Sequence, residues 1–395
     1  MVATDRTIKL ADILIEKNYD VILITVPFNN IQSKFVDNKQ YTDFEKRVNI
    51  MRVPFKKGTE SNFLVTNKSW FCKMFTGLLW RIYSDIGYGW NQNLLIKLNE
   101  IISQNKIDLI IATGGPFLSF IPVSDIAIKY KIPYILDYRD TWSETTHKFF
   151  GQTSYIPRLL ERKVNKYALS ISTVSEGCLK SLQKTCDSNK VKVLYNFPSR
   201  KYSNQLKTNS ENIKLGEHIR IVFTGSMYEG RTFRPVLKAF KLLDTKVQDK
   251  FLFVYCGANE AFVNNIFEEF NLLPYLINLG MLNKQEAWSI INSSDVCLNV
   301  VYDNTEAKDE SIKGIITTKI FDYLGLNKIC LNICPVGNEL YSIKDKFKLS
   351  NLYNFNGGDM HGIANFLTSI TEGKVKAHQQ EDTLSWEKQD FSWIP

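Results

Sequence analysis

Short apolar runs rich in β-branched residues alternate with helical patterns along almost the whole chain. The strands expected in the first half are Asp20–Val26, Asn49–Val53, Ile107–Thr113, Ile132–Tyr138, Ser170–Val174 and Lys190–Tyr195. The helical patterns between them are Arg6–Lys17, Asn91–Gln104, Leu118–Lys129, Ile156–Tyr167 and Glu176–Thr185. Near-continuous apolar strands need helices on both faces of a parallel sheet. The alternation therefore predicts a doubly wound α/β domain.

After a polar stretch, the same alternation begins again. The second set of expected strands is Ile219–Thr224, Phe251–Cys256, Ile277–Gly280, Asp295–Val300 and Lys328–Ile333. The second set of expected helices is Thr232–Asp244, Asn259–Phe270, Lys284–Asn292, Thr317–Leu324 and Met360–Ile370. A chain of 395 residues is long enough for two such domains. Ligands of open α/β sheets bind at the carboxyl ends of the strands, so we expect both domains to face a shared cleft.

The domain boundaries follow from the composition. We expect a first domain over 1–197, a linker over 198–217 and a second domain over 218–378. The final segment, 379–395, is too aromatic for a free tail, and we expect it to pack back toward the first domain.

Composition and charge narrow the class of protein. No apolar run reaches the roughly 18 residues of a membrane-spanning helix, and the N-terminus lacks signal-peptide features. Seven scattered cysteines favour a reducing compartment, so we expect a cytoplasmic protein. Residues 1–197 carry 27 basic against 18 acidic residues, whereas 198–395 carry 22 against 23. The basic first half suits an anionic membrane, a phosphorylated substrate or nucleic acid, or is an ordinary solvated surface.

The first candidate site follows the strand that ends at Thr224. Gly225 opens a loop, and a helix begins near Arg231 and Pro235. Backbone N–H groups at such a junction can bind an anion, and Arg231 or Arg234 can add charge for a diphosphate. A glycine at a strand–helix turn also has a purely structural explanation.

The second candidate site begins at paired threonines. Thr318 offers a hydroxyl to a phosphate, while Lys319 and Asp322 share one face of a short helix. Asp322 could accept hydrogen bonds from ribose hydroxyls. A capped helix with an exposed ion pair explains the same spacing.

The third candidate site follows the strand Ile132–Tyr138. Asp140 could act as a base or bind a hydroxyl, and Arg139 could hold an anion. Gly114 ends a neighbouring strand and would let the backbone approach a ligand. The alternative is a buried structural Asp–Arg pair.

Other chemistries have less support. The four histidines and the cysteines lack metal-ligand spacing, so we expect no metal and no cofactor. Walker, dinucleotide-binding and nucleophile-elbow motifs are absent from the sequence, as are nucleic-acid recognition motifs.

The order of these blocks resembles the GT-B glycosyltransferases of family 4, retaining sugar-nucleotide enzymes of bacterial surface-polysaccharide assembly. The resembling blocks include Asp108-Leu-Ile-Ile-Ala-Thr, Ile132-Pro-Tyr-Ile-Leu-Asp-Tyr-Arg-Asp-Thr-Trp, Phe223-Thr-Gly-Ser, Leu279-Gly-Met and Lys319-Ile-Phe-Asp-Tyr-Leu. The resemblance implies a UDP-sugar donor and a glycan or lipid-linked acceptor.

Carried over by position, the resemblance implies a role for each candidate residue. Gly225 and Arg231 would meet the donor diphosphate, Gly280 the nucleobase, Thr318 and Lys319 the distal phosphate, and Asp322 the ribose. Asp140 and Arg139 would line the acceptor side, with Gly114 near the transferred sugar.

The sequence departs from the family pattern at several positions. Arg231 stands where many relatives have lysine, and Asp322 stands where they have glutamate. Gly314 occupies the position of a second glutamate. The chain opens on a helical pattern, so we expect a truncated start or a first sheet built without the usual opening strand. A nucleotide-sugar 2-epimerase and an inactive scaffold of the same fold are the alternative functions.

A stretch in the first half suits a membrane surface. On a helix, Phe71, Met74, Phe75, Leu78 and Leu79 form an apolar stripe near basic Lys68, Lys73 and Arg81. Such a helix can lie in an anionic bilayer interface, so we expect peripheral contact with the inner face of the cell membrane. Packing of the stripe against the first sheet is the alternative.

Overall fold

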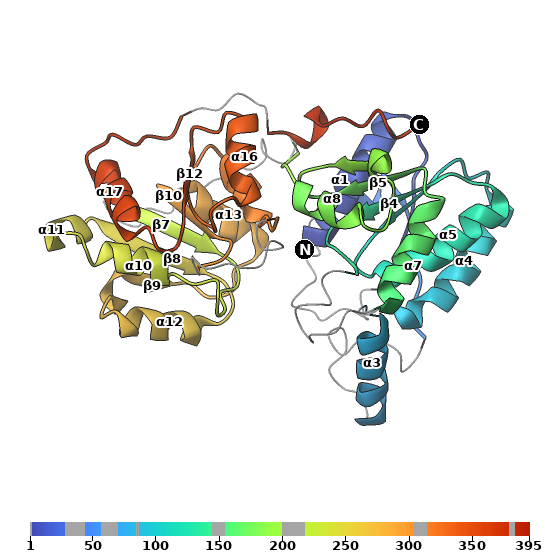
Figure 1. Ribbon diagram of the computed structural model, residues 1–395, viewed down its shortest axis with the longest axis horizontal. Coiled ribbons are helices and arrows are strands. Elements are labelled where there is room, and N and C mark those ends of the chain that lie inside the picture. Colours follow the sequence, from blue (N-terminus) through green and yellow to red (C-terminus); the bar gives the residue numbers. More distant parts are fainter. Residues whose placement is uncertain are drawn as a thin grey trace. The chain divides into compact units, whose positions relative to one another are not determined.

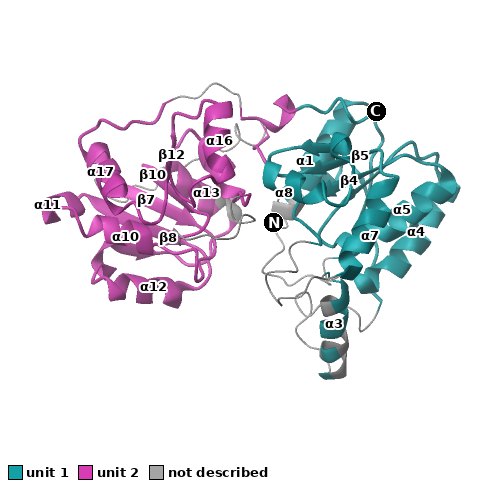
Figure 2. Cartoon of the chain, in the orientation of Figure 1, with its two compact units in different colours: residues 1–195, 390–395 teal, residues 196–389 magenta. Residues whose placement is uncertain are grey.

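A computed structural model describes residues 2–27, 44–56, 70–83, 85, 87–143, 155–199, 218–303, 314–378 and 384–395. The chain forms two compact units, residues 1–195 with 390–395 (unit 1) and residues 196–389 (unit 2), coloured separately in Figure 2. Each unit combines parallel strands with helices, which confirms the predicted α/β class (Figure 1).

Unit 2 contains one parallel six-stranded sheet. Its strands are β7 (Ile219–Thr224), β8 (Phe251–Cys256), β9 (Leu276–Asn278), β10 (Val296–Val300), β11 (Ile329–Ile333) and β12 (Leu352–Phe355). Their order in the sheet is β12-β11-β10-β7-β8-β9. The chain order therefore reverses between β7 and β10, and this topological switch point is where open α/β sheets bind ligands.

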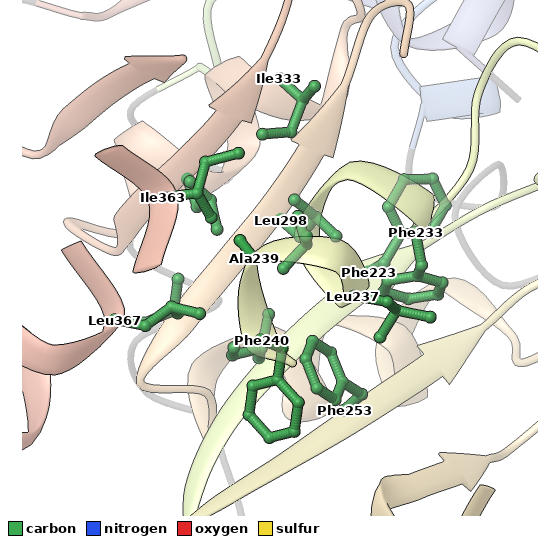
Figure 3. Packing of buried hydrophobic residues seen from close by; sticks show 14 of the residues in the cluster. Phe223, Phe233, Leu237, Ala239, Phe240, Phe253, Leu298, Ile333, Ile363 and Leu367 are labelled. Atoms are coloured by element: carbon green, nitrogen blue, oxygen red, sulfur yellow. The ribbon is translucent and has the colours of Figure 1, made fainter. Parts of the chain in front are cut away.

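Helices cover the sheet of unit 2. They are α10 (Arg234–Phe240), α11 (Thr245–Gln248), α12 (Glu260–Glu269), α13 (Lys284–Asn292), α15 (Lys319–Gly325), α16 (Glu339–Lys346) and α17 (Met360–Thr371). Single 3-10 turns lie at Leu273–Tyr275 and Trp386–Lys388. In Figure 3, Phe240 of α10 lies against Phe253 of β8, and Leu367 of α17 belongs to the same cluster. Burial of this aromatic-rich cluster is the main apolar contribution to the stability of unit 2.

Unit 1 contains two separate parallel sheets. The four-stranded sheet has the order β3 (Ile110–Thr113), β4 (Tyr134–Tyr138), β5 (Ser170–Thr173) and β6 (Val191–Val193). The two-stranded sheet pairs β1 (Ile22–Thr25) with β2 (Asn49–Arg52). Within the described ranges, no strand joins the two sheets. In the part of the first half that the structure describes, two sheets thus stand in place of the single sheet that strand–helix alternation predicts.

Helix α1 connects both sheets of unit 1. The helices of this unit are α1 (Val2–Glu16), α3 (Trp70–Tyr83), α4 (Asn91–Gln104), α5 (Phe120–Tyr130), α7 (Tyr155–Lys166) and α8 (Glu176–Leu182), with 3-10 turns at Tyr88–Trp90, Phe117–Ser119 and Ser188–Lys190. Ala11 of α1 packs in a cluster with Phe44 and Val48, next to β1 and β2. Arg6 of the same helix is bonded to Asp137 of β4.

The last residues of the chain divide between the units. The backbone N–H of Trp386 donates to the Pro198 carbonyl within unit 2. Residues 390–395 belong to unit 1, where Lys17 Nζ donates to the Ile394 carbonyl at 3.0 Å.

Several predicted elements differ from the structure. The predicted helix Thr232–Asp244 is shorter, since α10 ends at Phe240 and a separate turn of helix, α11, begins at Thr245. Helix α16 and strand β12 are absent from the predicted elements. Most of the predicted linker lies outside the described residues. No helix within the described ranges is both long and apolar enough to cross a bilayer.

Candidate functional site

The end of β7 is held by helix α15 from the opposite side of the switch point. The Thr224 backbone N–H donates to the Tyr323 hydroxyl at 3.2 Å, and the two side-chain hydroxyls lie 2.9 Å apart. Lys319 Nζ donates to the Thr224 carbonyl. Lys319 and Tyr323 are four residues apart, so both point from one face of α15 toward β7.

Gly225 makes room for the Lys319 side chain. Its φ of +105° lies in the region that favours glycine, and a Cβ built there would overlap Lys319 Nζ. The loop after β8 also approaches closely, because a Cβ at Gly257 would overlap the Gly225 carbonyl. The glycine that the sequence assigns to a ligand thus has a local function in admitting the lysine.

The Lys319 amine lies in an environment that disfavours its charge. Burial and the nearby Arg231 guanidinium lower its pKa to about 7, while Asp322 raises it. The amine also lies 4.8 Å from the centre of the Phe223 ring. Its hydrogen-bond partner, Thr224, supplies a carbonyl rather than a carboxylate, so the bond does not neutralise the ammonium.

Arg231 ends a tight turn that follows the same strand. Its backbone N–H donates to the Tyr228 carbonyl at 2.9 Å, and Gly230 supplies a φ of +85° at the corner. The guanidinium lies 5.3 Å from the centre of the Tyr228 ring. The buried Nε of Arg231 has no hydrogen-bond partner among the described residues. An unpaired buried donor of this kind suits an anion.

The two threonines before α15 have different environments. The Thr317 hydroxyl donates to Asn299 Oδ1 and is buried, whereas Thr318 is half-buried and makes no side-chain cap. Asp322 is half-buried, in the first turn of α15. Arg231, Lys319 and Asp322 therefore gather near Gly225, with an excess of positive charge.

Gly280 lies two strands away from this cluster, after β9. Its φ is +65°, and a Cβ there would come within 2.7 Å of Glu260 Oε1. Its backbone N–H donates to Asn278 Oδ1 at 3.2 Å. At the carboxyl edge of the sheet, Gly280 therefore lies against Glu260 and Asn278.

The candidate residues of unit 1 gather at the ends of β3 and β4. Arg139 Nε donates to the Gly114 carbonyl at 2.6 Å, and its Nη2 donates to the Gly115 carbonyl at 2.9 Å. A Cβ at Gly114 would lie 2.5 Å from the Phe117 ring, so packing alone requires this glycine. Arg139 thereby joins the loops that follow the two strands.

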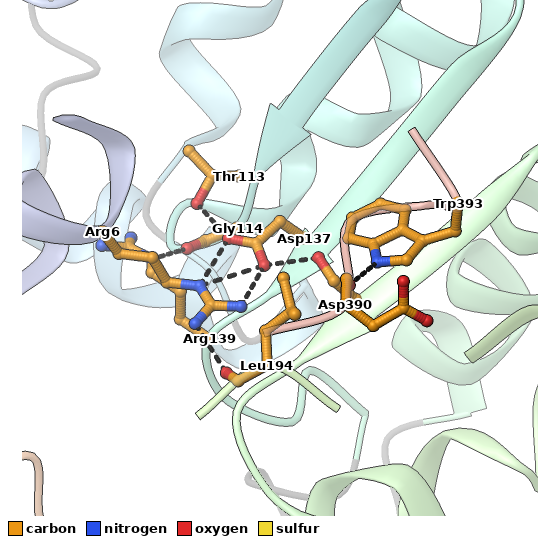
Figure 4. A network of polar contacts seen from close by, with 9 residues as sticks. Arg6, Thr113, Gly114, Asp137, Arg139, Leu194, Asp390 and Trp393 are labelled. Atoms are coloured by element: carbon orange, nitrogen blue, oxygen red, sulfur yellow. Dashed lines mark hydrogen bonds and ion pairs between the residues drawn. The ribbon is translucent and has the colours of Figure 1, made fainter. Parts of the chain in front are cut away.

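Asp140 and Asp137 have opposite environments. Asp140 is exposed, and desolvation by neighbouring atoms raises the pKa of its carboxyl while Arg139 opposes that rise. Asp137 is fully buried and accepts hydrogen bonds from Arg6, from Ser172 Oγ at 2.6 Å and from Thr113 Oγ1 at 3.0 Å (Figure 4). The buried Asp–Arg pair of this region joins Asp137 to Arg6, so the alternative considered from the sequence, a buried pair of Asp140 with Arg139, is wrong. No ion pair joins Arg139 to Asp140 in the described structure.

Two further polar groups were not identified from the sequence. Asp85 is buried and accepts the backbone N–H groups of Gly87 at 2.6 Å and Phe117 at 2.5 Å; burial raises its pKa to about 6. A row of buried asparagines crosses unit 2 through Asn299 and Asn332. The triplet Cys-Leu-Asn, which ends at each of these two asparagines, was a usable signal.

The comparisons with solved structures identify the fold. A glycosyltransferase from Rickettsia africae ESF-5 matches with a TM-score of 0.56 and 13% identity, covering 94% of this chain and 84% of that one. Sucrose-phosphate synthase from Thermosynechococcus elongatus matches with a TM-score of 0.53 and 10% identity, covering 91% of this chain and 81% of that one. WaaG, a glycosyltransferase involved in lipopolysaccharide biosynthesis, matches with a TM-score of 0.52 and 9% identity, covering 93% of this chain and 86% of that one.

Sequence comparisons give no further relatives. No protein-family model matches the chain, and a search of curated proteins finds no match. At these low identities the structural matches establish the fold. The chain has the GT-B fold, with two Rossmann-like α/β units, as the sequence resemblance predicts.

Proposed function

We propose that this protein is a retaining glycosyltransferase of family 4 that moves a sugar from a UDP-sugar to a hydroxyl of a glycan or lipid-linked acceptor in surface-polysaccharide synthesis. The observation that carries the proposal is the cation pair Arg231 and Lys319 at the switch point of unit 2, with a buried Arg231 Nε that lacks a partner in the described structure. A diphosphate supplies both the charge and the acceptor oxygens that such a pair needs.

The candidate residues of unit 2 have distinct roles in the proposed donor site. Arg231 and Lys319 bind the diphosphate and stabilise the charge that develops on it as the sugar leaves. The Thr318 hydroxyl donates to the distal phosphate, and Asp322 accepts from the ribose hydroxyls. Gly280 lies in the loop that meets the nucleobase.

Unit 1 supplies the acceptor side in this proposal. Asp140 binds the acceptor hydroxyl, and Arg139 holds the loop of Gly114 near the transferred sugar. The bond between the anomeric carbon and the diphosphate breaks as the acceptor oxygen bonds to the same face. The acceptor proton passes to the departing phosphate, which balances the reaction.

UDP affinity should depend on the protonation of Lys319. Anion binding favours the ammonium form, so the pKa of Lys319 is higher in the complex than its value of about 7 in the free protein. The affinity should therefore fall as pH rises above 7, by up to about tenfold per pH unit. Calorimetric titration of UDP from pH 7 to pH 9 measures this slope. Lys319→Met should bind more weakly with a flat profile, and an equal slope in both proteins would contradict the assignment.

Incubation with a panel of UDP-sugars separates the candidate activities. A transferase releases UDP slowly by hydrolysis without acceptor and faster with an acceptor glycan, whereas a 2-epimerase converts the UDP-sugar to its epimer. Asp140→Asn should reduce acceptor-dependent UDP release at least about tenfold, since a bond to a charged group is lost. Its UDP affinity should stay unchanged. Epimer formation, or failure of every UDP compound to bind, would contradict the transferase proposal.

We also propose peripheral contact between unit 1 and anionic membranes. Helix α3 projects from unit 1 (Figure 1), and Trp70, Met74 and Leu78 along it are 67%, 56% and 54% exposed. Their four-residue spacing places them on one side of the helix. The predicted stripe shares Met74 and Leu78 with this exposed side, and Leu79 is half-buried. Lys68 lies outside the described residues, as do the side chains of Phe71, Lys73, Phe75 and Arg81.

Vesicle co-sedimentation tests the membrane contact. Binding to vesicles containing phosphatidylglycerol should occur at low salt, fall at high salt and weaken severalfold in Trp70→Ser, because interfacial burial of the indole is lost. Leu242→Ser changes another exposed apolar side chain, in unit 2, and should bind as the natural protein does. Equal binding by both variants, or none to anionic vesicles, would refute the contact.

A further inference from the structure

Three asparagines form a continuous row across the sheet of unit 2. Asn299 of β10 is in register with Asn332 of β11, which is in register with Asn354 of β12. Asn299 Nδ2 donates to Asn332 Oδ1 at 2.6 Å, and Asn332 Nδ2 donates to Asn354 Oδ1 at 2.8 Å. Asn299 and Asn332 are 2% and 0% exposed. Buried amides are costly unless each polar atom is paired, and this row pairs them consecutively.

The direction of the hydrogen bonds is set at one end of the row. Asn354 Nδ2 donates to the backbone carbonyl of Leu340 at 3.2 Å, and a carbonyl can only accept. The orientation of each amide along the row then follows from the one before it. At the other end, Asn299 Oδ1 can only accept, so the Thr317 hydroxyl must donate to it.

The row ends at the segment that leads into α15. Thr317 lies two residues before Lys319. Asn338, which is not part of the row, donates from Nδ2 to the carbonyl of Ile315 in the same segment at 3.0 Å. Side chains from two different elements thus anchor the segment. Asn299 lies between Leu298 and Val300, which face the core cluster, so the row lies on the opposite face of the sheet.

We infer that Asn299, Asn332 and Asn354 are positioning residues, which act through Thr317 to hold the Lys319 amine over Gly225. This inference rests on the proposed function, because it assigns the donor diphosphate to that amine. Lys319 is the first residue of α15 and directly follows the anchored segment. A displacement of that segment would therefore also displace the Lys319 amine. Arg231 and Asp322 are the charged groups that act on the amine there.

A matched pair of substitutions tests the row. Thr317→Val removes the hydroxyl with little change of shape and leaves Asn299 Oδ1 without its donor, whereas Thr317→Ser retains the hydroxyl. Competitive acetylation across pH, read by mass spectrometry, reports the reactivity and pKa of Lys319 without a nucleotide. Titration with UDP reports the affinity, and thermal unfolding reports stability.

We expect Thr317→Val to move the pKa of Lys319 upward toward that of ordinary lysines and to weaken UDP binding roughly three- to tenfold. Thr317→Ser should match the natural protein in both. If Thr317→Val lowers only the melting temperature and leaves Lys319 reactivity and UDP affinity unchanged, the row is purely structural and the inference is wrong.

Two outcomes separate this inference from the proposed function. If UDP fails to bind the natural protein while Thr317→Val still shifts Lys319 reactivity, the donor assignment fails and the positioning role stands. Should Thr317→Val not fold, Asn354→Ala breaks the row at the half-buried outer strand. It should shift Lys319 reactivity in the same direction, and an unchanged reactivity overturns the inference.

Discussion

Arg6→Met should destabilise unit 1 by about 3–5 kcal/mol, the cost of leaving a buried charge without its partner. Arg6 is 2% exposed and donates to both Asp137 oxygens, at 2.7 Å from Nη2 and 2.9 Å from Nε. Its Nη1 also donates to the Leu194 carbonyl at 2.8 Å. The substitution therefore breaks the connection of α1 to the four-stranded sheet. Urea unfolding, with hydrogen exchange of peptides from β4 to assign the loss to unit 1, measures the effect.

An exposed ion pair provides the control for Arg6→Met. Arg52 contacts Glu45 at 2.5 Å with side chains 30% and 37% exposed, so Arg52→Met should cost less than about 1 kcal/mol. A similar loss in both variants would contradict the proposed contribution of the buried pair.

The defect of Arg6→Met should also depend on pH. Arg6, Ser172 and Thr113 lower the pKa of Asp137 against the opposing effect of burial. The pair therefore contributes fully above the unfolded pKa of about 3.9, and its contribution is lost as pH falls through the lower folded value. In Arg6→Met, burial is no longer opposed by Arg6, so the pKa of the Asp137 carboxyl should rise. The difference between the two proteins should thus be largest at neutral pH and shrink in acid.

The fold could be predicted from the sequence where apolar runs are buried on both faces. The predicted strands Ile219–Thr224 and Phe251–Cys256 coincide with β7 and β8, which lie inside the six-stranded sheet. Strand β12 lies at the edge of that sheet, is mostly half-buried and contains Asn354. Its sequence therefore lacks the continuous apolar run that marks a fully buried strand. Helix α16 combines four charged residues with few apolar ones, and its periodicity is correspondingly faint.

The candidate site could be predicted only in part. Arg231 was a candidate from the strand–glycine–helix junction after Thr224 and Lys319 from the start of a short helix, and the structure brings these two side chains near one another. Partners far apart in the chain could not be assigned: Lys319 bonds to a carbonyl 95 residues away, and Arg6 to a carboxylate 131 residues away. The local function of Gly225 could not be predicted for the same reason, since only the structure shows that Lys319 occupies the space above it.

The second large effect is expected at the donor site and tests the central proposal, that Arg231 and Lys319 bind a nucleotide diphosphate. Arg231→Gln should weaken UDP binding about ten- to a hundredfold, because a charge-assisted hydrogen bond to the diphosphate is lost. Arg234 is the matched control, since it lies three residues on and its Nη2 is already bound to Glu269 at 3.0 Å. Arg234→Gln should change the UDP affinity less than about twofold.

Calorimetric titration of UDP into the natural protein, Arg231→Gln and Arg234→Gln is the most direct test. The proposal predicts binding by the natural protein and Arg234→Gln and strongly weakened binding by Arg231→Gln. Equal affinities in the two variants, or no binding of UDP by the natural protein, would contradict it.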